Sequence, residues 1–241
     1  MGADQSHDWN ATIASAIDWW RDAGVDVELS DAPRDWLNAA PAAAAVGETA
    51  IAPVAAPPSL PATLEAFATW RTGPDALETG WGAKLIPADG PANAELMVLI
   101  EMPEREDAVE GRLLGGASGR LFDRMLAAIG LGRDSIHLAS VACARPTTGR
   151  IPREAVDPLG ALARHYVGLV APKRLLLLGN CASRTFFDAD VAQTRGLLRP
   201  LNHDGATMAL TSFHPQLLLE RPALKAEAWK DLQMLMRPVA S

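Results

Sequence analysis

The segment LMVLIEMPERED, residues 96–107, carries the pattern that decides the fold. Its first five residues are all apolar, which is typical of a parallel strand buried on both faces, and a turn crowded with carboxylates follows. A second segment, MALTSFHPQLLLERP at residues 208–222, is another apolar strand and ends in His-Pro. Ligands bind at the carboxyl edge of a parallel sheet, so a carboxylate at one strand end and an imidazole at another predict an active site there.

Strand and helix patterns alternate along the rest of this region. Further strands are expected at 136–141, 174–178 and 207–211, and helices at 63–71, 118–129, 153–170, 180–187 and 222–236. The helix at 153–170 is expected to be interrupted or restarted near Pro158. Helices between strands imply right-handed βαβ units. The sequence therefore predicts an α/β fold with three α/β/α layers and a central, mainly parallel, roughly four-stranded sheet.

The residues before about position 63 have a different character. Residues 8–24 show the spacing of an amphipathic helix, with Ile13, Ile17 and Trp20 on one face. Residues 39–62 are rich in Ala and Pro and offer few side chains for a core. We predict an N-terminal helical extension at 1–38, a linker at 39–62 and a globular domain at 63–241. Tryptophans in the extension are expected to pack on the domain or, alternatively, to bind a protein partner.

Composition limits the cellular setting. The chain has 241 residues, 49% of them apolar, and two cysteines, Cys143 and Cys181. So few cysteines argue against a disulfide framework and fit a reducing compartment. The start, MGADQSHDWN, lacks the basic and apolar parts of a signal peptide, and no apolar run reaches the roughly 18 residues that span a bilayer. We expect a cytoplasmic protein without a membrane partner.

The charge is unevenly distributed. The net charge is −7, yet from Arg112 onward bases outnumber acids, and most of these bases are arginine. Arginine's forked donor suits phosphate, which favours a nucleic-acid partner. The alternative is that the arginines reflect the codon usage of a GC-rich genome.

Five motifs in this order resemble those of one family. They are IEMPE at 100–104 followed by GRLLGGASGRLFD at 111–123, LAAIGLGRDSIHLASVACARP at 126–146, VAPKRLLLLGNCASRTFF at 170–187, the pair Arg195-Gly196, and SFHPQLLLERPALKAEAWKDLQML at 212–235. Together they resemble the uracil-DNA glycosylase superfamily, most closely the bacterial family-four type. The resemblance covers Leu64 to Met236. It implies a fold that flips a base out of single- or double-stranded DNA and excises it.

The chemistry of such a site is demanding. Cleavage of an N-glycosidic bond builds positive charge on the sugar and negative charge on the departing base, so a carboxylate and a hydrogen-bond donor are needed. By resemblance His214 is the donor, Glu101 is the glutamate of the first motif, and Asp107 is the acid that directs water. The alternatives are a histidine that caps a turn and carboxylates that are ordinary solvated loop charges.

The resemblance also assigns the pocket that holds the base. Leu114 falls where the family has a stacking phenylalanine, and Ser140 falls where it has a uracil-reading asparagine. Ile100 and Glu104 replace the two glycines of the first motif, where a side chain would narrow the pocket. The expected substrate-binding residues are Met102, Pro103, Leu114, Ser140, Arg112, Arg145 and Pro215. The two arginines among them are expected to contact phosphates, unless they are ordinary surface residues.

The resemblance to family-four enzymes implies four cysteine ligands of an iron–sulfur cluster. In this chain Ala76, Ala144 and Leu159 fall at three of those places. Cys143 is one position away from a ligand place, and Cys181 lies in an expected helix. Two cysteines cannot supply a four-thiolate site, so we expect no cluster, no metal and no cofactor.

These observations leave more than one function open. The first is a diverged, cluster-free glycosylase that hydrolyses the N-glycosidic bond of uracil or a related damaged base in DNA. The alternative is a non-catalytic member of the fold that binds nucleic acid or a protein partner, because the stacking ring and the asparagine are both lost. A third hypothesis is that the substrate is a free nucleotide or nucleoside.

Overall fold

The computed structural model describes residue 15, residues 60–201 and residues 207–236. The chain divides between Ala55 and Ala56, and the following description concerns the second unit. The expected N-terminal helix and Ala/Pro-rich linker fall almost entirely outside the described residues. The division into extension, linker and domain therefore stays a prediction.

The centre of the domain is a five-stranded sheet with the order β2-β1-β3-β5-β4. Four strands are parallel: β1 (Leu96–Ile100), β2 (Ile136–Ser140), β3 (Arg174–Leu178) and β5 (Met208–Ser212). The mainly parallel sheet is thereby confirmed. The fifth strand, β4 (Arg199–Pro200), pairs antiparallel with β5 at the edge. The sequence pattern missed β4 because two residues carry no periodicity.

The strand order reverses beside β1. Leu99 pairs with Ala139 of β2 on one side and with Leu177 of β3 on the other. The chain therefore leaves β1 in one direction to form β2 and crosses back over it to form β3. Such a reversal opens a crevice at the carboxyl edge of the sheet, where the segments after β1 and β3 face each other.

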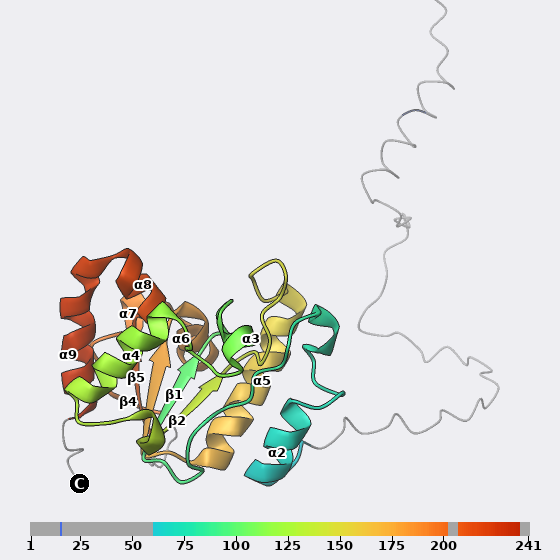
Figure 1. The fold of residues 1–241 in the computed structure, drawn as a ribbon, viewed down its shortest axis with the longest axis horizontal. Coiled ribbons are helices and arrows are strands. Elements are labelled where there is room, and N and C mark those ends of the chain that lie inside the picture. The colour runs from blue at the N-terminus through green and yellow to red at the C-terminus, as the bar shows by residue number, and fades with distance from the viewer. Residues whose placement is uncertain (1–14, 16–59, 202–206, 237–241) are drawn as a thin grey trace, which may run out of the picture. The chain divides into compact units, whose positions relative to one another are not determined.

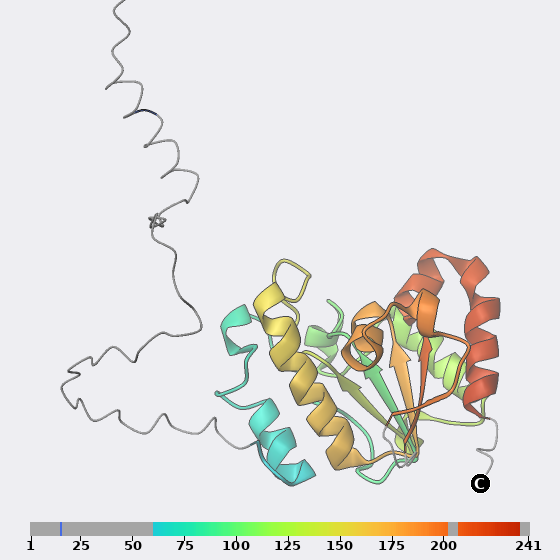
Figure 2. The same cartoon turned by 180° about the vertical axis from the view of Figure 1, so that it is seen from behind.

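Helices cover both faces of the sheet, which confirms the three layers. They are α2 (Leu64–Arg71), α3 (Asp107–Glu110), α4 (Ala117–Ala128), α5 (Arg153–Val170), α6 (Asn180–Phe187), α7 (Val191–Thr194), α8 (Pro215–Glu220) and α9 (Lys225–Leu235), with 3-10 turns at Thr79–Trp81, Arg133–Ser135 and Pro222–Leu224. In Figure 1, α4 and α9 lie on one side of the sheet and α2 and α5 on the other. Figure 2 shows the molecule from the opposite side, where the long helix α5 lies in front of the strands.

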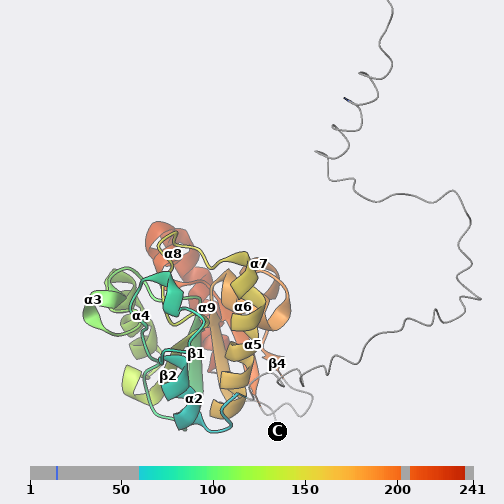
Figure 3. The same cartoon turned by 90° about the vertical axis from the view of Figure 1, so that its right-hand side faces the viewer.

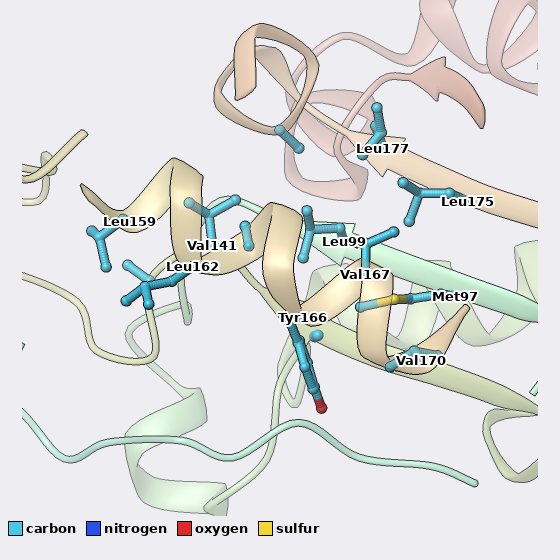
Figure 4. Packing of buried hydrophobic residues seen from close by; sticks show 14 of the residues in the cluster. Met97, Leu99, Val141, Leu159, Leu162, Tyr166, Val167, Val170, Leu175 and Leu177 are labelled. Atoms are coloured by element: carbon cyan, nitrogen blue, oxygen red, sulfur yellow. The ribbon is translucent and has the colours of Figure 1, made fainter. Parts of the chain in front are cut away.

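Alternate residues of the buried strands supply the two cores. Met97 and Leu99 of β1 contact the face covered by α5, whose apolar residues recur at helical spacing from Leu159 to Val170 (Figure 4). Leu96, Val98 and Ile100 of β1 point to the opposite face and belong to the second core, beneath α4 and α9. Each fully buried leucine or methionine of these clusters contributes about 1.5–3 kcal/mol. This packing holds the strand ends rigidly in place.

The predicted interruption of the helix at 153–170 near Pro158 is wrong. Helix α5 runs without interruption through Pro158. Pro158 lies in the second turn of the helix, and the carbonyl that loses its partner belongs to Glu154, which is exposed near the helix start. Solvent can satisfy that carbonyl, so the helix continues.

A buried ion pair joins α2 to the segment that follows β2. Arg71 Nη1 lies 2.5 Å from Glu78 Oε2, and both side chains are buried. The second Arg71 nitrogen donates to the carbonyl of Val141 at 2.8 Å, and Glu78 Oε1 accepts from the backbone N–H of Cys143 at 2.7 Å. The bonds to Val141 and Cys143 therefore tie this local ion pair to a segment about 70 residues further along the chain.

Candidate active site

A pocket of about 600 Å³ lies at the carboxyl edge of the sheet. Three strand ends contribute to it: Glu101 and Met102 after β1, Gly179 and Asn180 after β3, and His214 after β5. The other lining residues are Glu104, Arg145, Gly149, Arg150, Asp190, Val191, Ala192, Phe213, Gln216, Leu217 and Glu220. Helices α7 and α8 both lie at the upper end of the sheet in Figure 3. The volume suits a small organic group such as a nucleobase.

His214 is held by the start of helix α8. It is the N-cap residue, and its Nδ1 accepts the backbone N–H of Gln216 at 3.3 Å. Pro215 occupies the first helical position, where its missing N–H costs nothing. Burial lowers the pKa of His214 to about 4, against a smaller opposing effect of the Asp107 charge. The imidazole is therefore neutral near pH 7, and with Nδ1 accepting, its proton resides on Nε2.

Gly179 adopts, at the end of β3 beside this histidine, a backbone conformation that other residues rarely adopt. Its φ of 96° lies in the region that favours glycine, and its N–H donates to the carbonyl of Ser212 at 3.0 Å. A Cβ atom at this position would lie 3.6 Å from Cβ of His214. The end of β3 thus forms the floor beside the imidazole.

Glu101 brings a carboxyl group into the same pocket. Its carbonyl accepts the N–H of Ala142 at 2.9 Å, which extends the pairing of β1 with β2 by one step. Burial raises the pKa of Glu101, while the charges of Arg145 and Arg184 lower it. The structure therefore brings Glu101 and His214 together, as the strand-end pattern predicted.

Arg145 also faces the pocket and is fixed to its wall. Its Nη1 donates to the carbonyl of Pro103 at 3.3 Å. Met102 lines the pocket, whereas Pro103 and Pro215 are buried and are not among the lining residues. These two prolines shape the backbone on either side rather than present a surface to a ligand.

The structure does not bring the Asp107 side chain into the pocket. Asp107 is fully buried, and its two oxygens accept three backbone N–H groups: Glu104 at 2.8 Å, Leu114 at 3.0 Å and Gly115 at 2.7 Å. These bonds close the loop that leads from β1 to α4. A carboxylate engaged in this way organises the backbone and has no oxygen turned toward a pocket water.

Leu114, Ser140 and Arg112 also lie apart from this pocket. Leu114 has a φ of 51° and a fully buried side chain in the core beneath α4. Ser140 lines a separate cavity of about 50 Å³ beside α5. Arg112 is exposed and pairs with Glu110 at 3.2 Å. The single cavity expected for these side chains together with His214 is not formed.

Several pocket residues are not predicted as site residues by the sequence, and three of them, Glu104, Asn180 and Phe213, bear on the chemistry of the pocket. The sequence predicts Glu104 only as a side chain that narrows the pocket, and it predicts no site role for Asn180 or Phe213. Asn180 Oδ1 accepts the N–H of Val191 at 3.0 Å, and Arg195 packs 5.0 Å from the centre of the Phe213 ring. Asn180 and Phe213 each stand within two residues of a strand end, the same signal that identified Glu101 and His214.

The residues of this chain do not fit a four-thiolate cluster. Ala76, Ala144 and Leu159 stand at three of the ligand places, and the described part of the chain contains no group of three or more metal-binding side chains. Burial raises the pKa of the Cys143 thiol to about 11 and that of Cys181 to about 12. Metal ligands are thiolates, and burial disfavours that form here.

Among the residues that the structure describes, no helix is long and apolar enough to cross a membrane.

Comparison with known proteins agrees with the fold. Residues 87–233 match the model of the uracil DNA glycosylase superfamily. The chain is 27% identical over 158 residues to the type-4 uracil-DNA glycosylase of Archaeoglobus fulgidus, a match that covers 62% of this chain and 79% of that protein. It is 26% identical over 157 residues to the type-4 enzyme of Pyrobaculum aerophilum, with 62% and 80% covered. The chain therefore belongs to the uracil DNA glycosylase superfamily, and the relatives that it resembles are of the family-four type.

Proposed function

We propose that this protein excises uracil or a related damaged base from DNA by hydrolysing the N-glycosidic bond. The observation that carries the proposal is the orientation of His214, whose cap bond at Nδ1 leaves the Nε2 proton as a donor in a pocket that also holds Glu101. The relatives named above are uracil-DNA glycosylases, which supports the same reaction class.

The geometry supports distinct roles for the two groups. A flipped base enters the pocket, and His214 Nε2–H donates to the base carbonyl on which negative charge develops as the C1′–N1 bond breaks. A neutral imidazole can fill this role because its Nε2–H stabilises the developing charge through a hydrogen bond and keeps its proton. The Glu101 carboxylate stabilises positive charge on the sugar and accepts a proton from the water that attacks C1′. Asp107 supports this arrangement through the loop that it closes.

Base reading in this proposal falls to Phe213 and Asn180. The amide oxygen of Asn180 is occupied by Val191 N–H, so its NH₂ group is left to donate to a base carbonyl. Arg195 backs the Phe213 ring, and the ring offers a surface for stacking. Leu114 and Ser140 contribute to the packing behind the loop and to the second cavity, while Met102 supplies an apolar wall.

The DNA backbone is expected to lie along the arginines at the pocket. Arg145 and Arg150 both line it, and arginine suits phosphate. Arg112 lies outside the pocket and would contact a more distant phosphate. Single- and double-stranded DNA both remain candidate partners. A cytoplasmic location and a protein partner for residues 1–38 complete the proposal.

One observation favours a second candidate function. The side chains at the family's base-reading positions, Leu114 and Ser140, do not reach the pocket. A protein that keeps the fold but binds DNA or a partner protein without cleavage would tolerate this change.

A gel assay separates these functions. Uracil-containing single- and double-stranded oligonucleotides are incubated with enzyme in excess, and abasic sites are revealed by alkaline cleavage. We expect product from wild type, a loss of about 100-fold or more in His214→Ala and Glu101→Ala, and wild-type activity in Glu154→Ala, an exposed control. No abasic product from wild type would overturn the proposal. DNA binding that falls steeply with salt but yields no product would establish the binding function instead.

A further inference from the structure

The proposed mechanism assigns no role to Glu104, a carboxyl group that lines the same pocket as His214. The Glu104 side chain is only 10% exposed. One oxygen, Oε2, accepts a hydrogen bond from the Ser118 hydroxyl of α4, and the backbone N–H is held by Asp107. The other oxygen, Oε1, is buried and has no hydrogen-bond partner among the described residues. A buried acceptor without a partner is costly and calls for a physical reason.

The unpartnered oxygen faces His214. Oε1 lies 3.9 Å from Nδ1, the nitrogen that already accepts the N–H of Gln216 at 3.3 Å. Two acceptor atoms face each other, so the arrangement is stabilised when a proton lies between them. A shift of about 1 Å would bring the two atoms to hydrogen-bonding distance.

The charges around Glu104 come from three elements. Burial raises the pKa of Glu104, and the Ser118 hydrogen bond lowers it. The carboxylates of Asp107 and Glu106, in the same loop, raise it further, while Arg145, from the segment after β2, lowers it. His214, from the end of β5, is neutral and adds no charge near pH 7.

We propose that Glu104 is a positioning residue that carries a proton directed at Nδ1 of His214 and so strengthens the Nε2–H donor on the opposite side of the ring. This rests on the proposed function. As negative charge grows on the base carbonyl, Nε2–H donates more fully and the imidazole becomes more electron-rich. The Glu104 proton offsets that charge at Nδ1 without leaving its oxygen.

The first test is the pH dependence of single-turnover cleavage. In wild type the rate should fall as pH rises through the Glu104 titration, because the proton at Oε1 is lost. Glu104→Gln mimics the protonated acid, since its amide oxygen can accept from Ser118 while its NH₂ group faces Nδ1. It should keep the wild-type rate and lose that limb of the profile. Glu104→Ala should be about tenfold slower, the effect of one net hydrogen bond, and should also lose the limb.

Two further variants sharpen this test. Ser118→Ala removes a bond that favours the charged form, so the limb should move to higher pH. Glu110→Gln, an exposed carboxylate of α3, should leave the profile unchanged. A Glu104→Gln variant that is as slow as Glu104→Ala would overturn the proposal, because the carboxylate itself would then be required.

An NMR titration tests, without measuring activity, whether Glu104 carries a proton directed at Nδ1 of His214. The side-chain nitrogens of His214 are followed in full-length protein with ¹⁵N-labelled histidine and are assigned by their loss in His214→Ala. Wild type should show a second inflection of the Nδ1 shift that is absent in Glu104→Gln. A single inflection in wild type would overturn the proposal. If wild type cleaves no DNA, the proposed function fails, while the NMR result still decides how Glu104 acts.

Discussion

Replacement of Asp107 by alanine should destabilise the protein severely. The substitution leaves three buried backbone N–H groups, those of Glu104, Leu114 and Gly115, without an acceptor. Each buried donor left unpaired costs about 1–3 kcal/mol, which gives a total of about 3–9 kcal/mol. Because a domain of this kind has a free energy of unfolding of about 5–15 kcal/mol, Asp107→Ala should lose a large fraction of it.

Asparagine at this position provides an intermediate case. One oxygen can still accept from Glu104 and Leu114, but the NH₂ group then faces the N–H of Gly115. We expect Asp107→Asn to lose about 1–3 kcal/mol, the cost of one unpaired amide. Glu110→Ala, on the same short helix but exposed, should lose less than about 0.5 kcal/mol.

The assay is urea unfolding of the full chain followed by tryptophan fluorescence, with the midpoint and slope fitted for each variant. Asp107→Ala within 1 kcal/mol of wild type would refute the reasoning. A stable Asp107→Asn that no longer cleaves DNA would instead favour the water-directing role predicted from the sequence.

Three other results are expected. Arg71→Met leaves the Glu78 carboxylate buried without its partner and should lower the free energy of unfolding by about 3–5 kcal/mol, which is seen as a lower Tm. The double variant Arg71→Met/Glu78→Gln should recover part of this stability. A double variant that is no more stable than Arg71→Met would contradict the pairing. His214 has a depressed pKa of about 4, so the unfolded chain takes up its proton first. The stability from this group is present above about pH 6.5 and is lost as pH falls toward 4. The loss amounts to about 3 kcal/mol at most. In His214→Gln the free energy of unfolding should depend less on pH between these values. Phe213→Ala should lower kcat/KM for uracil-containing DNA about 5- to 150-fold, with Phe213→Trp retaining activity, and equal activity of all three proteins would exclude stacking on this ring.

The sequence predicted the four parallel strands closely because buried strands read as continuous apolar runs. The expected strand 96–100 is β1 as observed, and 136–141 and 207–211 differ from β2 and β5 by about one residue at their ends. The short elements α3, α7 and α8 were not predicted. Four to six residues carry too little periodicity, and tertiary contacts such as the bonds to Asp107 stabilise such elements.

The same difference between strands and irregular segments explains which site residues the sequence placed correctly. Residues directly after a strand have a direction fixed by the strand, so Glu101 and His214 were placed in one pocket from their positions alone. Leu114 lies in a loop where a φ of 51° turns the side chain into the core. The direction of Asp107 likewise depends on which amides surround it. Such local geometry follows from contacts between distant segments, which a linear pattern does not contain.

The cap bond of His214 has an evolutionary consequence. Nδ1 of His214 caps helix α8, and this bond also fixes the orientation of the Nε2–H group. The start of the helix and the proposed chemistry therefore both depend on this one side chain. Asparagine caps helices well but has a shorter side chain, so His214→Asn would preserve the helix start and withdraw the donor from the pocket. Histidine and asparagine codons differ by a single base. One mutation would therefore remove the donor that the proposed function requires and leave a folded protein.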